Sequence, residues 1–255
     1  MIFLDDNKKI LEMMNDNTID LIYIDPPYNT GKTQKLNDYK YSDKFDSYID
    51  FIKPLLEESH RVLKDTGSFF IHLDYREVHY VKVELDKIFG RDSFKNEIIW
   101  HYDFGGKAKK FWPRKHDNIL YYTKSDKYTY NYNDIEYIPY MSNMCNDKDK
   151  LERGKKPTDT WWFSIVGTNS NERTGYPTQK PLKLLERIIK THSKEEEIVL
   201  DFFAGSGTTG EACLNLDRHC ILIDSNPELT DIWTERFHKF KNDSRKIELL
   251  VDDRL

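Results

Sequence analysis

The sequence predicts an α/β fold built on a mostly parallel, doubly wound sheet. Two observations carry this prediction: short apolar runs alternate with segments of helical periodicity, and turn-forming residues end several of these runs. Alternating strands and helices place parallel strands in a sheet that is covered on both faces. With 255 residues and neither an internal repeat nor a low-complexity linker, we expect residues 1–255 to form a single domain.

The first half of the chain begins this alternation with the apolar run Ile19–Ile24, which stops at Asp25-Pro26-Pro27 as a buried strand would. Five further segments are predicted to be helix, strand, helix, strand and strand: 48–63, 68–73, 76–89, 97–100 and 118–123.

The regular pattern fails between 124 and 174, where Tyr, Asn, Asp and Lys dominate, and this stretch is the natural insert. It returns with a helix over 181–192, for which Pro181 is well placed as the start. Three more segments follow as strand, helix and strand: 198–200, 208–216 and 219–223.

Composition excludes several classes of protein. The hydrophobic fraction of 38% leaves no run of the 18 apolar residues that a membrane span needs, and aromatic residues at 14% exclude a disordered chain. The cysteines Cys145, Cys213 and Cys220 form no C-x-x-C pair, so neither a disulfide framework nor a metal site is expected. A reducing, cytoplasmic location fits this cysteine usage.

The net charge of −5 conceals a basic middle, since residues 103–194 hold 18 Lys/Arg against 11 Asp/Glu. Within it, the stretch 104–116 combines five basic residues and three aromatic residues with no acid, a composition suited to phosphates and stacked bases. A solvated loop is an equally good interpretation. The candidate DNA-binding residues of this strip are Lys107, Lys109, Lys110, Arg114 and Lys115.

A Gly-rich turn follows the predicted strand at 198–200, in the sequence Asp201-Phe-Phe-Ala-Gly-Ser-Gly. Gly205 and Gly207 allow a tight turn and a close approach to a ligand, while Asp224, at the end of the next strand, can accept both hydroxyl hydrogens of a ribose. Two glycines alone often mark an ordinary turn, but the whole unit predicts a nucleoside-type cofactor. An ATP phosphate loop does not match.

The second motif is Asp25-Pro26-Pro27-Tyr28, at the end of the first predicted strand. The two prolines remove N–H donors and leave carbonyl groups beside a carboxylate and an aromatic ring, which together suit a planar amino group. By itself the motif is more often a strand ended by prolines and followed by a packed Tyr. Ligands of open α/β sheets bind at the carboxyl ends of strands, and both motifs lie at such ends.

Three motifs in this order give the chain a recognisable resemblance: Asp25-Pro-Pro-Tyr, then Tyr176-Pro-Thr-Gln-Lys-Pro181, then Asp201-Phe-Phe-Ala-Gly-Ser-Gly-Thr-Thr. The sequence resembles the β class of S-adenosylmethionine-dependent DNA amino-methyltransferases, which place the catalytic motif before the cofactor motif. Segments 23–31, 69–74 and 77–82 are particularly similar to the modification subunits of type III restriction-modification systems. The resemblance implies a Rossmann-like methyltransferase fold with a target-recognition insert at about 103–174.

The resemblance also implies roles for matched residues. Asp25, Pro26, Pro27 and Tyr28 would face the target base as catalytic residues. The loop on the methionine side of the cofactor would consist of Asp201, Phe203, Gly205 and Gly207. Asp224 would accept the ribose hydroxyls. The segment that closes over the other side of the cofactor would contain Thr178, Gln179 and Lys180. The family commonly has Pro where this chain has Phe202, a change of packing that touches no reacting group.

The activity implied is site-specific transfer of a methyl group from S-adenosylmethionine to N6 of an adenine flipped out of double-stranded DNA, as in restriction-modification or epigenetic systems. Two alternatives stay open: N4-cytosine methylation, which more usually carries Ser at the position of Asp25, and a non-catalytic DNA-binding or specificity subunit of the same fold. A homodimer and a restriction subunit are further partners to test.

Two aromatic features receive structural interpretations. His72 and His79 lack a third ligand at a convincing spacing, so we expect surface or helix-packing histidines. Trp161-Trp162-Phe163 is expected to pack in the core of the insert, with a base-stacking platform as the alternative.

Overall fold

The apolar runs build a nine-stranded sheet in the computed structural model, which describes residues 1–36, 39–140, 147–240 and 249–251. β7 is antiparallel to both of its neighbours and the other paired strands of this sheet are parallel, so the predicted doubly wound, mostly parallel sheet is confirmed. The strand order is β11 (Leu249–Val251), β1 (Ile2–Leu4), β10 (His219–Asp224), β9 (Ile198–Asp201), β2 (Ile19–Ile24), β5 (Leu63–Leu73), β7 (His116–Thr123), β6 (Phe94–His101) and β8 (Thr160–Trp162).

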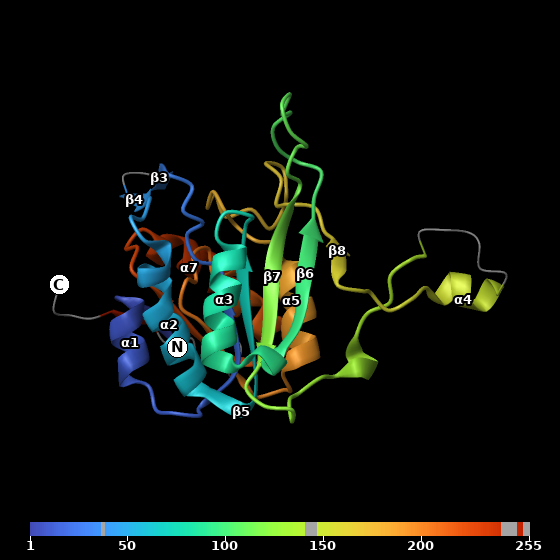
Figure 1. Cartoon of the computed structure of the whole chain (residues 1–255), viewed down its shortest axis with the longest axis horizontal. Helices are drawn as coiled ribbons and strands as arrows, with labels where there is room; N and C mark the ends of the chain where they lie inside the picture. Colours follow the sequence, from blue (N-terminus) through green and yellow to red (C-terminus); the bar gives the residue numbers. More distant parts are fainter. Residues whose placement is uncertain (37–38, 141–146, 241–248, 252–255) are drawn as a thin grey trace.

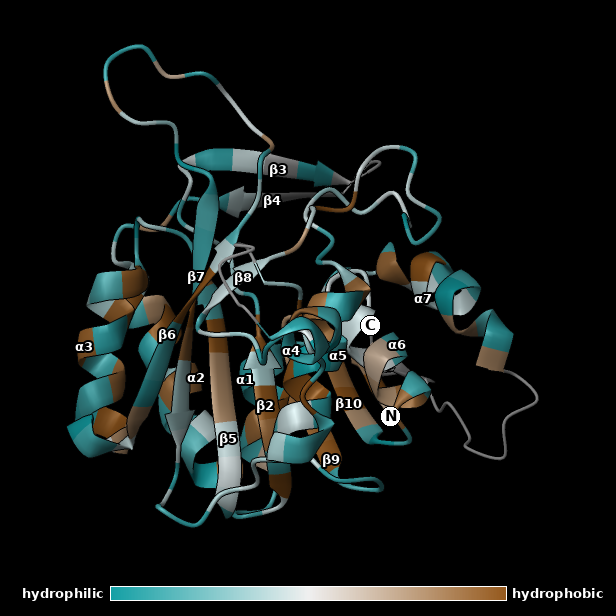
Figure 2. Cartoon of the chain, turned by 90° about the vertical axis from the view of Figure 1, so that its right-hand side faces the viewer, coloured by the Kyte–Doolittle hydropathy of each residue, from teal (hydrophilic) through white to brown (hydrophobic). Residues whose placement is uncertain are grey.

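Helices cover both faces of this sheet (Figure 1). One face carries α1 (Asn7–Met13), α2 (Tyr48–Val62) and α3 (Val78–Phe89), and the other carries α5 (Leu182–His192), α6 (Thr208–Asn215) and α7 (Leu229–Phe237). Figure 2 shows the apolar central strands enclosed between these helices. β5 illustrates the alternation that feeds both layers, since Phe69 and Ile71 pack with α2 and α3 whereas Phe70 packs with α5.

The predicted helices and strands lie close to the observed ones, because burial and capping coincide with the apolar pattern. All six residues of β2 are buried, and the Ser47 side chain caps α2 by accepting a hydrogen bond from the N–H of Asp50 at 3.3 Å. β1 and the antiparallel hairpin of β3 (Lys32–Leu36) with β4 (Tyr39–Asp43) were not predicted, since three residues or a largely polar run give no clear period.

The strands β2 and β9 are neighbours at the point where the chain order of the sheet reverses. The chain leaves β2 for α2 on one face and leaves β9 for α6 on the other. A crevice therefore opens between their carboxyl ends, which is where open α/β sheets bind ligands.

The segment 103–174 is not a continuous insert, because it contains the core strand β7. Its first part, 102–115, leaves the carboxyl end of β6 at the same edge of the sheet as the crevice. The described residues of its second part, 124–140 and 147–159 with the short helix α4 (Lys148–Arg153), lie beyond the end of β7 at the opposite edge, where Asn131 donates to the carbonyls of Lys190 and Ser193 at the end of α5. Figure 1 shows this arm projecting from the body.

Two structural interpretations need correction. His72 is neither a surface histidine nor a helix-packing one, because it is fully buried on β5 and its ring lies against those of Tyr23, Tyr28 and Trp100. Trp161 packs in the core against α5 as expected, but Trp162 is 63% exposed and its ring meets that of His101 edge-on.

Cys213 and Cys220 are free, and Cys145 lies outside the described residues. Within the described ranges, no helix is long and apolar enough to cross a membrane. The same ranges contain no group of three His, Cys, Asp or Glu side chains arranged to hold a metal ion.

Candidate active site

The carboxyl ends of β2, β9 and β10 meet around a pocket of about 380 Å³. Both predicted motifs lie in this pocket together with the segment that connects β8 to α5. The predicted catalytic and cofactor residues that line it are Asp25, Pro26, Pro27, Tyr28, Thr178, Gln179, Lys180, Asp201, Phe203, Gly205 and Asp224. Gly207 shapes the turn without lining the pocket.

The Asp201 carboxylate holds the Gly-rich loop through two hydrogen bonds. One carboxylate oxygen accepts a hydrogen bond from the N–H of Phe203 at 3.0 Å and the other accepts one from the hydroxyl of Thr209 at 2.5 Å. Burial raises the pKa of Asp201 to about 7, against the lowering effect of these hydrogen bonds. Asp201 thus holds the loop and the start of α6 in one geometry.

The loop itself requires its glycines. Gly205 and Gly207 have φ values of +47° and +76°, a region that side chains rarely adopt, and a Cβ on Gly207 would lie 3.0 Å from the ring of Trp233. The Asp224 carboxylate accepts hydrogen bonds from the N–H groups of Gly205 and Asn226 at 2.9 and 3.0 Å. Burial raises the pKa of Asp224, and this residue lines the pocket where the sequence predicts a ribose.

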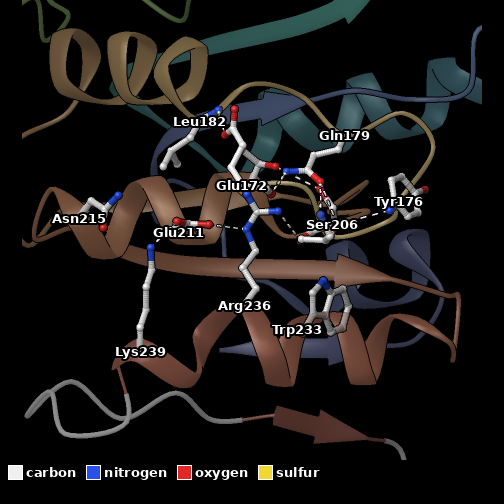
Figure 3. Close-up of polar contacts among 12 residues, drawn as sticks. Glu172, Tyr176, Gln179, Leu182, Ser206, Glu211, Asn215, Trp233, Arg236 and Lys239 are labelled. Atoms are coloured by element: carbon white, nitrogen blue, oxygen red, sulfur yellow. Dashed lines mark hydrogen bonds and ion pairs between the residues drawn. The ribbon is translucent and has the colours of Figure 1, made fainter. Parts of the chain in front are cut away.

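Helix α7 supports the same loop, and Figure 3 shows its Arg236 reaching toward Ser206 and Glu211. The Trp233 indole donates to the carbonyl of Gly205 at 2.9 Å, and the Arg236 guanidinium donates to the carbonyl of Ser206 at 3.0 Å. Arg236 also forms a buried ion pair with Glu211 of α6, with 2.6 Å between Nε of Arg236 and Oε2 of Glu211. Glu211 forms a second ion pair with Lys239. The sequence reasoning missed these supports, because nothing in the motif signals a partner so far along the chain.

On the opposite side of the pocket, Asp25 is engaged by two side chains. The Tyr28 hydroxyl donates to one Asp25 oxygen at 2.6 Å, and the ammonium group of Lys180 forms an ion pair with the other. Burial and the Asp25 charge raise the pKa of Tyr28 well above its ordinary value, so its hydroxyl is a donor here. Lys180 was predicted to act on the cofactor, but its charged end is on the predicted catalytic carboxylate.

The carbonyl groups of the Pro-Pro pair are not both free. The Tyr48 hydroxyl donates to the carbonyl of Pro27 at 2.7 Å, which ties the motif to the start of α2. Among the described residues, none donates a hydrogen bond to the carbonyl of Pro26. Pro26 therefore keeps an available acceptor beside Asp25.

Gln179 acts within its own segment. Its side-chain carbonyl accepts from the N–H and hydroxyl of Thr174, and its amide donates to the carbonyl of Glu172 at 2.5 Å (Figure 3). This buried side chain shapes the turn that carries Thr178 and Lys180 to the pocket.

Other pocket residues escaped prediction. Asp6 and Asn7 at the start of α1 line the pocket, and the Asn7 amide donates to the carbonyl of Phe202 at 3.2 Å. Their signal is the polar triplet Asp5-Asp6-Asn7 directly after the apolar run Ile2–Leu4, a strand whose end meets the same edge of the sheet. Phe45 and Phe51 line the pocket from the β4–α2 region.

The predicted DNA-binding residues do not line the pocket but lie in the loop between β6 and β7. Lys107, Lys109 and Lys110 are exposed. Lys115 donates to the carbonyl of Gly105 at 2.9 Å and so braces the loop, while the Arg114 guanidinium lies over the ring of Tyr75 at 3.8 Å. Three exposed aromatic side chains accompany the lysines: Phe104, Phe111 and Trp112.

A Rossmann-like sheet with a Gly-rich loop, an acid on the next strand and Asp-Pro-Pro-Tyr across the pocket defines a nucleoside-cofactor methyltransferase of the amino-group class. Residues 19–235 match the family model described as DNA methylase, and the chain belongs to this family.

Curated relatives agree with this assignment. The chain is 39% identical over 237 residues to the type II methyltransferase M.HpaI of Haemophilus parainfluenzae, an alignment that covers 89% of this chain and 71% of the relative. It is 34% identical over 231 residues to the DNA adenine methyltransferase YhdJ of Escherichia coli K12, covering 86% of this chain and 76% of the relative.

The fold also matches solved structures. PvuII DNA methyltransferase, named as cytosine-N4-specific, aligns with a TM-score of 0.70 at 18% identity over 92% of this chain and 85% of its own. Structures of the same fold have been solved with S-adenosylmethionine, the methyl donor of this family. The pocket suits that cofactor, because carboxylates and aromatic rings surround the place for a cationic, nucleoside-bearing molecule.

Proposed function

We propose that this protein is a site-specific DNA adenine methyltransferase of the β class that methylates N6 of a flipped-out adenine. The observation that carries the proposal is that Asp25 and Tyr28 share one pocket with the Gly205 loop and Asp224. This arrangement brings the place for an amino group next to the place for a methyl donor.

The amino group at C6 of adenine is a poor nucleophile, since its lone pair is delocalised into the ring. Asp25 and the carbonyl of Pro26 can accept its two hydrogens, which favours a pyramidal nitrogen whose lone pair points at the methyl group. Tyr28 stacks on the base. These residues position and polarise the nitrogen, and no covalent enzyme intermediate is required. As the nitrogen lone pair forms the bond to the methyl group, the bond from that methyl group to sulfur would break, and the Asp25 carboxylate can take the proton that the nitrogen then loses.

Binding of the base changes the contacts of Asp25. The Tyr28 hydroxyl and Lys180 occupy one oxygen each, so the amino hydrogens use the remaining lone pairs or displace one of these donors. The ion pair with Lys180 then keeps the carboxylate oriented while the base enters.

S-adenosylmethionine supplies an electrophilic sulfonium methyl group when it is bound. Asp224 is placed to accept the ribose hydroxyls, and Phe203 with the Gly205 turn is placed to hold the methionine side.

DNA must reach the pocket from the edge of the sheet where the β6–β7 loop lies. The exposed lysines of this loop are placed to bind phosphates, and this helps to offset the few kcal/mol needed to flip a base. The described parts of the arm, 124–140 and 147–159, lie at the opposite edge, so we assign base recognition to the β6–β7 loop and to residues 163–180. These two segments replace the broader target-recognition region 103–174.

Adenine is favoured over cytosine by Asp25 in the first position of the motif and by the relative named for adenine methylation. The relatives reported above carry type II or adenine methyltransferase names, while the type III likeness rests on the segments around 23–31 and 69–82. A homodimer and an accompanying restriction subunit remain part of the proposal through that likeness.

The test is transfer of tritiated methyl from S-adenosylmethionine to unmethylated bacterial DNA, followed by nucleoside digestion and mass identification. We expect label in N6-methyladenine, and a loss of roughly 100- to 1,000-fold in Asp25→Ala, on the order of the effect of removing an electrostatic contact to the reacting group. Label in N4-methylcytosine would overturn the base assignment. Cofactor binding without any transfer would favour the non-catalytic alternative.

A further inference from the structure

A buried polar chain lies behind the base-binding side of the pocket. The hydroxyl of Tyr23 and Nδ1 of His72 are 2.9 Å apart, and Nε2 of His72 is 3.3 Å from a carboxylate oxygen of Asp117. The Tyr102 hydroxyl donates to the other Asp117 oxygen at 3.0 Å. These four side chains come from β2, β5, β7 and the end of β6.

The carboxylate of Asp117 is the acceptor at one end of this row of hydrogen-bonded side chains. Burial alone would raise the pKa of Asp117, but its contacts to His72, the charge of Lys180 and the Tyr102 hydrogen bond hold that pKa below its ordinary value. Since the Asp117 carboxylate only accepts, Nε2 of His72 carries the proton that faces it, and Nδ1 of the same ring faces the hydroxyl of Tyr23. The pKa of Tyr23 is raised well above its ordinary value by burial, so its hydroxyl is a donor.

The hydrogen-bonded side chains described above touch the proposed catalytic motif through ring contacts. The His72 ring stacks against that of Tyr28, with centroids 6.2 Å apart and an interplanar angle of 27°, and Trp100 meets His72 edge-on at 5.3 Å. Tyr23 itself lines the pocket. The contacts of its two ring nitrogens with Tyr23 and Asp117 hold the His72 ring in one orientation. The His72 ring in turn lies against one face of the Tyr28 ring.

Packing alone does not call for these polar groups. His72 is fully buried and lies in the strand after the apolar Phe69-Phe70-Ile71, where an apolar ring would fill the space without desolvating an imidazole and a carboxylate. A hydrogen-bonded ring differs from an apolar one in having a single orientation.

We propose that His72, held by Tyr23 and Asp117, is a positioning residue for methyl transfer that sets the ring orientation of Tyr28. Tyr28 must stack on the base while its hydroxyl reaches Asp25, so a tilt of its ring moves both contacts. The inference rests on the proposed function, since it assigns His72 a role in the same reaction.

The first test is a double-mutant cycle. We expect His72→Ala and His72→Phe to lower kcat for methyl transfer by roughly 10- to 100-fold, as displacement of a positioned group does, with the cofactor Kd unchanged within about twofold. In a Tyr28→Ala background, His72→Ala should have no further effect, because it acts through Tyr28. His79→Ala, at an exposed histidine of α3, is the matched control.

Conservative replacement separates orientation from volume. His72→Phe keeps a flat ring and Asp117→Asn keeps an acceptor oxygen, so Asp117→Asn should retain more activity than His72→Phe. Equal transfer by wild type and His72→Phe would overturn the inference. Multiplicative losses in the double variant, or a cofactor affinity that falls in step with transfer, would also overturn it.

A second measurement does not depend on DNA. The ring resonances of Tyr28 in protein with labelled tyrosine, assigned through Tyr28→Phe, should shift in His72→Phe and stay in place in His79→Ala. An unmoved Tyr28 contradicts the positioning role even if the wild-type protein methylates DNA. A wild type that transfers no methyl group contradicts the proposed function alone, since the Tyr28 signal still reports on His72.

Discussion

The two sides of the pocket are built differently. On the side of β9 and β10, the carboxylates of Asp201 and Asp224 and the side chains of α7 hold backbone groups of the Gly-rich loop. On the side of β2, Asp25 bonds to the side chains of Tyr28 and Lys180, which can exchange partners. The β9 and β10 side therefore determines the shape of the pocket, because its side chains hold the backbone of the Gly-rich loop. On the β2 side the contacts are between side chains, and these can rearrange when a base enters.

The largest effect should come from breaking the support of the rigid side at Arg236. Arg236→Met leaves the carbonyl of Ser206 without this donor and removes the buried partner of Glu211. We expect the free energy of unfolding in urea to fall by about 3 kcal/mol, as for other buried pairs from which one partner is removed. Calorimetric titration should also show weaker cofactor binding.

The matched control for Arg236 is Lys239→Met, which removes the second ion pair to the same Glu211. Lys239 is 53% exposed, so its loss should cost less than about 1 kcal/mol. Equal destabilisation by the two variants would show that the loop does not depend on Arg236.

Lys180 offers the corresponding test on the adaptable side. We expect Lys180→Met to lower kcat by roughly 10- to 100-fold, because Asp25 loses the group that orients it. Steady-state kinetics with both substrates varied should place the loss in kcat. A rise in KM for the cofactor alone would instead support the role that the sequence predicted for Lys180.

Asp201 gives the rigid side a pH signature. Its pKa is about 7 in the folded protein and about 4 when unfolded, so the folded state binds the extra proton and its stability falls as pH rises between these values. Between pH 5 and pH 8, wild type should lose on the order of 2 kcal/mol of unfolding free energy relative to Asp201→Asn. Urea unfolding of both proteins at the two pH values measures this difference, and a constant difference would contradict it.

The contrast between the two sides also explains what the sequence could predict. Strands β2 and β9, the Gly-rich turn and the Asp-Pro-Pro-Tyr motif are local patterns, and the structure brings them together as expected. The ion pair of Lys180 with Asp25 joins residues 155 positions apart, which no periodicity reveals. His72 was predicted to be a surface or helix-packing histidine, because the hydrogen bonds that hold it are formed with Tyr23 and Asp117, which are distant in the sequence.

The smallest effect on the reaction itself should come from the exposed β6–β7 loop, which touches neither side of the pocket. Replacing Lys107, Lys109 and Lys110 together with Ala should leave stability and kcat at saturating DNA unchanged, since these side chains are exposed and remote from Asp25. The plot of log affinity for DNA against log salt concentration has a negative slope, and its magnitude should decrease by about three in this variant. The reason is that each lysine neutralises one phosphate in the wild-type complex. A triple replacement of Lys8, Lys53 and Lys87, exposed lysines of α1, α2 and α3, is the control. If both triple variants change the slope equally, the loop is a solvated turn and DNA approaches the pocket along another surface.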